Sequence, residues 1–182
     1  MALDLAEGET ITGLPPIEDS SNARLCDRHY EQCRDELQRG FRWNFNRSSK
    51  ALALLASVPE GNWTYAYQLP TDYMKFYQFV GDNNLEIPYE IYEDKQLLTN
   101  DTTGKIVYGK KITDSVKFDT LYIKALSFTL AARMSPKLTN SRTKTADLEQ
   151  KALAFAASGA GVDAQDSPEE KAEQSSWLNS RI

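Results

Sequence analysis

The sequence predicts an α+β protein, a small antiparallel helix bundle with an inserted antiparallel β-sheet region and a flexible C-terminal tail. Three observations lead to this fold class. Apolar residues recur at helical spacing near the N-terminus and again in the last third of the chain. Between these segments, apolar and polar residues alternate in short runs separated by turn residues, which is typical of strands. From Asp166 onward the chain is mostly polar and acidic, a composition that cannot support its own core.

We expect a single domain over residues 1–182, because a chain of this length can bury one sizeable core. Residues 1–19 are expected to be extended or poorly ordered, since Gly8, Gly13 and Pro15-Pro16 interrupt a helix. The other predicted parts are helical segments at about 20–45 and 114–165, a β-rich insertion at about 50–112 and a tail at 166–182.

The first predicted helix runs from about Asn22 to Arg39. Ser20 or Ser21 can cap its first-turn amides, and Gly40 can take the left-handed conformation that closes a helix. Its apolar stripe recurs at steps of three and four: Ala23, Cys26, Tyr30, Cys33 and Leu37. The polar side chains that we expect mostly to face water are Arg24, Arg28, Glu31, Arg34, Asp35 and Gln38.

An aromatic turn follows this helix, formed by Phe41, Trp43 and Phe45. We expect the apolar stripe to pack on both C-terminal helices and the aromatic turn to fasten the helix to the sheet. Residues 49–58 are a short stretch rich in alanine and leucine, and a turn follows at Pro59, Gly61 and Asn62. The predicted strands of the small antiparallel sheet are Trp63–Leu69, Lys75–Val80, Tyr89–Tyr92, Gln96–Leu98 and Lys105–Ile112.

Helical spacing returns after Asp114 or Asp119, either of which can cap a helix that Pro136 is expected to end. The apolar face of this helix consists of Phe118, Leu121, Tyr122, Ala125, Phe128, Thr129 and Ala132. A further helix is predicted to start near Thr143 or Thr145. Its predicted apolar positions are Ala146, Leu148, Leu153, Ala156 and Ala157.

Charge and composition narrow the function classes. A net charge of −5 argues against a protein that wraps nucleic acid, which usually has a basic face. There is no run of about 18 apolar residues, and acidic residues stand where a secretory signal is basic, so we expect no membrane contact and synthesis in the cytoplasm. Cys26 and Cys33 are separated by about 10 Å along a helix, too far for a disulfide, and are read as buried hydrophobes.

The only histidine, His29, suggests two kinds of site, and both lack partners. It shares a helical face with Cys26 and Cys33, but a structural zinc site needs a fourth ligand, and no further cysteine or histidine exists. As a general base for a cysteine nucleophile it has no recognisable orienting group. We expect no metal site and no catalytic residue at this position.

Acidic pairs were considered as glycosidase carboxylates, for example Glu86 with Glu90 or Glu31 with Asp35. Their spacing gives no positive signal, so solvated acids are the favoured interpretation. Overall we expect no enzyme activity and no cofactor. Among the basic residues, Lys105, Lys110, Lys111 and Lys117 cluster near the last strand, where lysines either blunt a sheet edge or contact an acidic partner or nucleic acid.

The order of features resembles the tail tubular protein A family, the head-to-tail adaptor or gatekeeper proteins of short-tailed, T7-like bacteriophages. The resemblance covers roughly residues 18–180 and rests on a combination of blocks that occur in this order. These blocks are ARLCDRHYEQCRDELQRGFRWNF, WTYAYQLPTDYMKF, YEIYEDKQLLTN, IVYGKKITD, FDTLYIKALSFTLAARMSPKLT and DSPEEKAEQSSWLNSR. Family members usually open with a further helix before the position of Ile11, and here that region is shortened.

The resemblance implies a structural virion protein that forms a twelve-subunit ring between the portal protein and a tail nozzle protein of the tail tubular protein B type. Genome DNA would pass through the ring without sequence-specific binding. The tail, with Trp177, Leu178 and Arg181, would bind the portal; tryptophan is enriched at binding hot spots. The residues expected to contact other subunits or partners are Arg24, Arg28, Arg34, Lys110 and Lys111.

Two other functions stay open at this point. One is a tail-associated hydrolase of polysaccharide or peptidoglycan, which would need a pair of carboxylates. The other is a soluble DNA-binding module, which the net charge disfavours.

Overall fold

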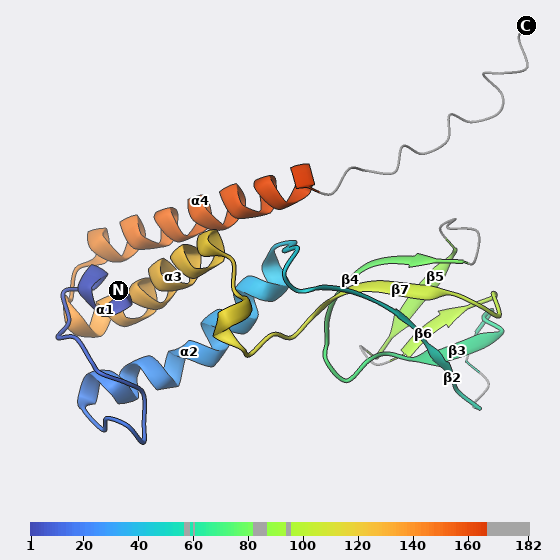
Figure 1. The fold of residues 1–182 in the computed structure, drawn as a ribbon, viewed down its shortest axis with the longest axis horizontal. Coiled ribbons are helices and arrows are strands. Elements are labelled where there is room, and N and C mark those ends of the chain that lie inside the picture. Colours follow the sequence, from blue (N-terminus) through green and yellow to red (C-terminus); the bar gives the residue numbers. More distant parts are fainter. Residues whose placement is uncertain (57–58, 60, 82–86, 94–95, 167–182) are drawn as a thin grey trace, which may run out of the picture.

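The computed structural model describes residues 1–56, 59, 61–81, 87–93 and 96–166. It confirms the predicted α+β class, with the helices at one end of an elongated molecule and two small antiparallel sheets at the other (Figure 1). The helices are α1 (Ala2–Leu5), α2 (Ser21–Gly40), α3 (Thr120–Leu138) and α4 (Arg142–Asp166), with a 3-10 turn η1 (Ser115–Lys117) before α3.

The start of α2 and its end at Gly40 are confirmed, whereas the predicted left-handed conformation of Gly40 is wrong. The Ser20 hydroxyl accepts a hydrogen bond from the Ala23 amide at 3.2 Å, which caps the helix. Gly40 is the last helical residue and does not take the left-handed conformation. Instead Phe41 continues with extended backbone and donates its amide to the Leu37 carbonyl.

The predicted apolar stripe of α2 is buried except at Tyr30, which is half-buried. The prediction that Arg34 and Gln38 face water is wrong, because their exposed fractions are 3% and 0%. Gln38 widens the buried face toward the chain that returns from the sheets, where it pairs with Ile112. A stripe of apolar residues does not mark this second contact, since Gln38 is a polar side chain that is buried through its hydrogen bonds.

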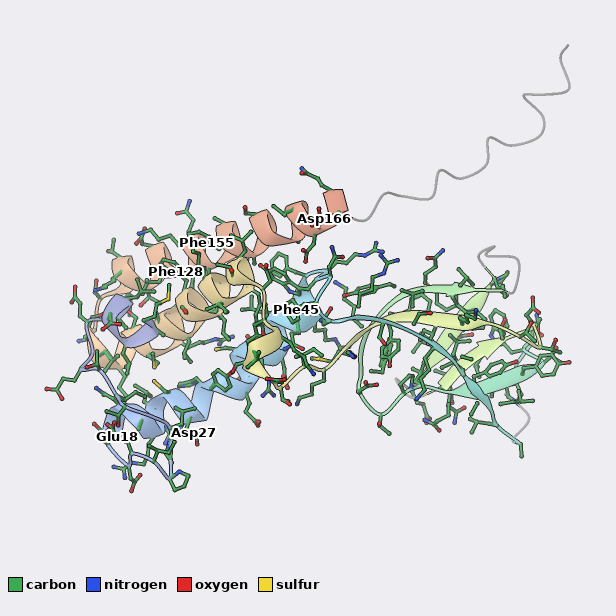
Figure 2. All side chains as sticks on the ribbon, viewed as in Figure 1. Glu18, Asp27, Phe45, Phe128, Phe155 and Asp166 are labelled. Carbon is green, nitrogen blue, oxygen red and sulfur yellow. The ribbon has the colours of Figure 1, made fainter. Side chains whose placement is uncertain are left out.

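The aromatic turn joins the helical core, so the prediction that it fastens α2 to the sheet is wrong. Trp43 is fully buried, its indole N–H donates to the Leu37 carbonyl at 2.9 Å, and its ring lies edge-on to Tyr122 of α3 at 5.2 Å. Phe45 packs on the same tyrosine at 4.9 Å, at the end of the helical part nearest the sheets (Figure 2). The rings therefore tie α2 to α3.

Helix α3 lies between α2 and α4, and this central position corrects the expectation that α2 packs on both C-terminal helices (Figure 1). Asp119 caps α3 by accepting hydrogen bonds from Leu121 and Tyr122. Pro136 does not end the helix, which continues to Leu138. A proline near the last turn removes only one hydrogen bond, so one further half-turn is tolerated.

Helix α4 packs on α3 along a narrow stripe of small residues. Its buried residues are Leu148, Ala152, Ala156 and Gly159, whereas the predicted positions Ala146, Leu153 and Ala157 are exposed. Phe155 stacks on Phe128 of α3 at 5.2 Å (Figure 2). At Gly159 an added Cβ would lie 2.5 Å from the Trp43 ring, so only glycine allows this close approach.

The N-terminal segment contains a helical turn where we expected no regular structure. Leu3 of α1 and the following Ala6 are 5% and 0% exposed and pack with α3 and its neighbours. A four-residue helix has no periodic pattern to detect, and its packing on α3 stabilises it.

The middle of the chain forms two antiparallel sheets where one was predicted, with strand orders β1-β7-β4 and β2-β3-β6-β5. The strands are β1 (Arg47–Ala51), β2 (Ala53–Leu54), β3 (Tyr65–Gln68), β4 (Tyr73–Val80), β5 (Tyr89–Tyr92), β6 (Gln96–Thr99) and β7 (Lys105–Lys110). Strands β1 and β2 were not predicted. These two are separated by Leu52 alone, so one extended stretch crosses from the first sheet to the second.

The sheets share a core to which both contribute. Its buried residues are Tyr67, Leu69, Phe79, Leu97, Ile106 and Tyr108. This core is separate from the cluster around Trp43 in the helical part. The helical part (residues 1–46 and 111–166) and the sheet part (residues 47–110) therefore have their own cores, and contacts at the junction decide how they are held together.

Candidate functional site

The junction between the two parts is built around the Gln38 side chain of α2. Its amide nitrogen donates to the Ile112 carbonyl at 2.8 Å, and its amide oxygen accepts from the Ile112 N–H at 2.9 Å. The amide thus pairs with the backbone as a neighbouring strand would. The Tyr122 hydroxyl, whose pKa is raised by burial, lies next to this amide and donates to the Arg34 carbonyl at 2.9 Å. These buried hydrogen bonds fix the chain that leaves β7 against α2.

An ion-pair chain extends the junction toward the surface and brings together two of the predicted contact residues. Arg34 Nε donates to Asp35 Oδ1 at 2.8 Å, and Lys111 Nζ donates to Asp35 Oδ2 at 2.7 Å. Burial by itself raises the pKa of Asp35, but the hydrogen bonds from Arg34 and Lys111 hold it below its usual value. Asp35 is therefore ionised at neutral pH, and Arg34 and Lys111 are both paired with it.

The side chains of the other predicted contact residues are not part of this ion-pair chain. Arg24 is exposed near the start of α2 and pairs with Asp19 at 3.0 Å, and Arg28 is exposed on the same helix. Lys110 ends β7 and is half-buried. Because Arg34 is almost fully buried, it offers little surface to a neighbouring subunit, whereas Arg24 and Arg28 are accessible.

Three residues that we expect to bind the portal, Trp177, Leu178 and Arg181, lie outside the described residues.

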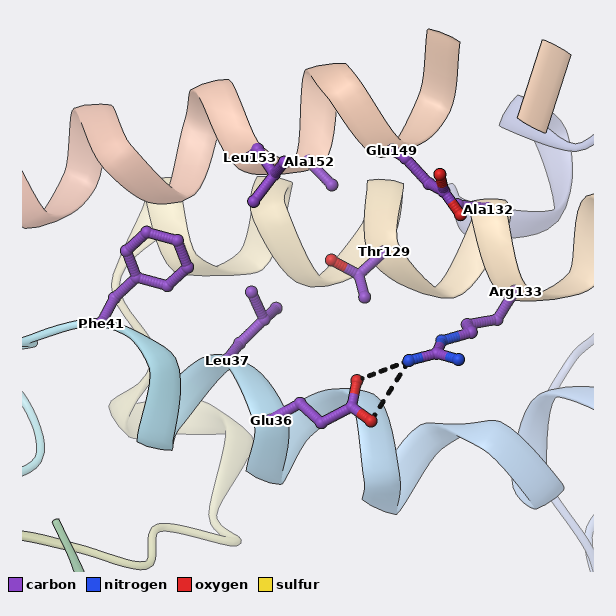
Figure 3. A pocket seen from close by; sticks show the side chains of 9 residues that line it. All are labelled: Glu36, Leu37, Phe41, Thr129, Ala132, Arg133, Glu149, Ala152 and Leu153. Atoms are coloured by element: carbon purple, nitrogen blue, oxygen red, sulfur yellow. Dashed lines mark hydrogen bonds and ion pairs between the residues drawn. The ribbon is translucent and has the colours of Figure 1, made fainter. Parts of the chain in front are cut away.

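A groove of about 400 Å³ runs between α2 and α4 over α3 (Figure 3). It exists because α2 packs on α3 and leaves α4 to one side. Its lining consists of Glu36, Leu37, Phe41, Thr129, Ala132, Arg133, Glu149, Ala152 and Leu153. The Arg133 guanidinium spans the groove wall to the Glu36 carboxylate at 2.9 Å. With a mostly apolar lining and with Glu36 and Arg133 paired to each other, the groove suits apolar side chains better than a polar reaction.

The two thiols are unsuited to nucleophilic chemistry. Burial raises the pKa of the Cys33 thiol to about 11 and also raises that of Cys26, so both are protonated at neutral pH. Cys26 Sγ lies 3.4 Å from Met134 Sδ within the helical core. Across the described residues, no three histidine, cysteine or acidic side chains gather where they could hold a metal ion.

The acidic pairs are placed in different surroundings. Glu31 is exposed, and its proposed partner Asp35 belongs to the ion-pair chain with a lowered pKa, which does not suit a general acid. Glu90 accepts a hydrogen bond from the Trp63 indole at 2.6 Å, and Glu86 lies outside the described residues.

Gln38, the residue at the centre of the junction, was not predicted as a contact residue. It is polar and lies four residues after Arg34 on the side of the helix expected to face water, so no apolar pattern in the sequence marks it.

No protein-family model matches this chain, and a search of curated proteins finds no match. Within the described part of the chain, no helix has the length and apolar character needed to span a membrane.

Proposed function

We propose that this protein is a structural head-to-tail adaptor of a short-tailed bacteriophage virion, assembled as a ring between portal and tail nozzle around the DNA ejection channel. The proposal is supported by the order of the sequence blocks, from ARLCDRHYEQCRDELQRGFRWNF to DSPEEKAEQSSWLNSR, which resembles that of the adaptor family. In this role the protein is not an enzyme and acts through its surfaces.

The arrangement of the two parts supports this proposal. The helices and the sheets gather at opposite ends of an elongated molecule, which provides two different surfaces for two different partners (Figure 1). The junction between them is held by buried hydrogen bonds and an ion-pair chain, so the two surfaces keep a fixed relation. Such a design suits a connector better than a catalyst.

Electron microscopy of the purified protein, alone and mixed with the portal protein of the same phage, tests the proposal. The expected result is a ring with a central hole, formed either by the protein alone or on the portal. A protein that stays monomeric and does not associate with the portal would overturn it. Lysis of cell walls in a turbidity assay, abolished by replacing one acidic residue without loss of the fold, would favour the hydrolase instead.

The portal-binding role of the tail is tested separately. Trp177→Ala/Leu178→Ala is expected to weaken portal binding at least about 100-fold, because aromatic and apolar anchors dominate such interfaces. The matched control is Gln174→Ala/Asn179→Ala, which changes two polar residues of the same segment and should bind as the parent does. Equal binding by both variants would show that the tail assignment is wrong, while ring formation on the portal would still support the adaptor.

A further inference from the structure

A cluster of cations lies on the outer face of the three-stranded sheet, where that sheet meets the helical part. Residues 39–58 contain four basic residues and no acidic one, although the whole chain has a net charge of −5. Two of these, Arg42 and Arg47, are exposed and belong to the cluster. The third member, Lys75, comes from β4 and is half-buried.

The sheet register places two of these cations in one row. Arg47 of β1 and Lys75 of β4 both pair with Gly109 of β7, one on each side. Directly opposed residues point to the same face, and Ile106 and Tyr108 point to the shared core on the other face. The row Arg47–Gly109–Lys75 therefore faces outward.

The Tyr77 side chain holds the cluster together. A Cβ added at Gly109 would lie 2.8 Å from the Tyr77 hydroxyl, so this ring lies across the row. The Arg42 guanidinium lies over the ring at 5.1 Å from its centre. Burial raises the pKa of the Tyr77 hydroxyl, and the positive charges of Arg42 and Arg47 partly lower it again. Both guanidinium groups thus lie close to this ring.

The cluster holds positive charge without carboxylate partners for two of its members. Among the described residues, neither Arg42 nor Lys75 pairs with a carboxylate; Lys75 Nζ donates to the Gly40 carbonyl at 3.1 Å. Burial lowers the pKa of Lys75, and the charge of Arg42 lowers it further. The nearby Asp163 carboxylate already accepts a hydrogen bond from the Asn44 amide at 2.8 Å.

An amide donor without an acceptor lies in the same place. Asn46 is fully buried and its Nδ2 has no hydrogen-bond partner among the described residues, while its Oδ1 accepts from the Tyr77 hydroxyl at 3.4 Å. A buried donor of this kind costs free energy unless an acceptor completes it. Together with three cations, it marks a place where an anion would be stabilised.

We propose that Arg42, Arg47 and Lys75 form a binding site for phosphate groups, and that its ligand is the phosphodiester backbone of nucleic acid. Phosphate contacts carry no sequence information. The face of the Tyr77 ring that could stack on a base is taken by Arg42, so the site reads the backbone and no base. The proposal does not depend on the adaptor function, although a ring would repeat the site once per subunit around its channel.

Fluorescence anisotropy of a labelled DNA duplex, measured with the full chain at several salt concentrations, tests the site. With three phosphate contacts, the affinity should fall by about 40-fold between 50 and 200 mM salt. Arg42→Gln/Lys75→Gln removes two contacts, so its affinity should fall only by about 4-fold over the same range. The matched control Lys137→Gln/Arg142→Gln removes two exposed cations elsewhere and gives the same net charge.

The control should keep the parent's salt dependence, and two duplexes of different sequence should bind equally. No binding by the parent at low salt, or the same salt dependence for both double variants, would overturn the proposal.

Competition experiments with unlabelled ligands distinguish the possible ligands of the site. Displacement of the duplex by a second, unlabelled duplex but not by polyglutamate supports nucleic acid. Displacement by polyglutamate at equal charge concentration, or by inorganic phosphate as readily as by duplex, would show that the ligand is an acidic protein surface or a free phosphate instead.

Discussion

The helical part and the sheet part achieve their stability by different means. The helical part surrounds one indole: Trp43 is in contact with Phe41, Phe45 and Tyr122, and Gly159 lets α4 approach it. The sheet part spreads a thinner core over two small sheets, and five of its seven strands contain an exposed residue. A thin pair of sheets with exposed edges has less apolar area to bury, so its stability depends more on the junction with α2.

The largest effect is expected when that junction is broken. In Gln38→Ala, the buried N–H and C=O of Ile112 lose their partners, and the free energy of unfolding should fall by about 3 kcal/mol. Chemical denaturation followed by circular dichroism measures this change. Gln32→Ala, an exposed glutamine on the same helix, should change it by less than about 0.5 kcal/mol. If both variants are equally stable, the junction does not hold the two parts together.

A smaller effect is expected from crowding the indole of the helical part. Gly159→Ala forces its new methyl group against the Trp43 ring, and overpacking of this kind should cost about 2 kcal/mol. Two residues further along the same helix, Gly161 has open space around it, so Gly161→Ala should stabilise the protein by up to about 1 kcal/mol. Thermal unfolding of the two variants compares them directly. Equal melting temperatures would mean that α4 adjusts its distance from α3.

The smallest effect concerns the ion-pair chain of the junction and depends on pH. The pKa of Asp35 is lower in the folded protein than in the unfolded chain, so its contribution to stability is present above about pH 4 and is lost as the pH falls through the folded pKa. In Asp35→Asn the loss of stability between pH 5 and pH 2 should be smaller by less than about 1 kcal/mol. Asp27→Asn, an exposed residue on α2, serves as the control. An unchanged acid profile for Asp35→Asn would exclude this linkage.

Helices and strands could be predicted where a periodic pattern of side chains faces a single packing partner. The stripe and the cap of α2 and the strands with alternating residues were predicted for this reason. Prediction failed where one residue serves two partners. Arg34 and Gln38 follow the polar rule for a helix surface, yet both are buried. Gln38 pairs with Ile112 of the chain that leaves β7, and nothing in its spacing records that contact.

The missed strands and the N-terminal helical turn share another physical cause. The β1 and β2 residues are nearly all exposed, so no alternation between apolar and polar side chains marks them. The α1 turn and the course of α3 beyond Pro136 depend on tertiary packing, which outweighs local propensity. The cluster of cations formed by Arg42, Arg47 and Lys75 was not predicted, because its members come from a turn, from a strand without alternation and from a bulged strand.

The chain enters and leaves the sheet part at one place. Arg47 pairs with Gly109, and the Lys110 amide donates to the Asn46 carbonyl at 2.9 Å. Paired antiparallel strands lie about 5 Å apart, so a linker of a few residues could join Asn46 to Lys111 directly. The sheet part is therefore an insertion that could be replaced as a unit. Any domain whose own ends lie side by side fits the same two chain ends, and evolution can exchange one end of this molecule without rebuilding the other.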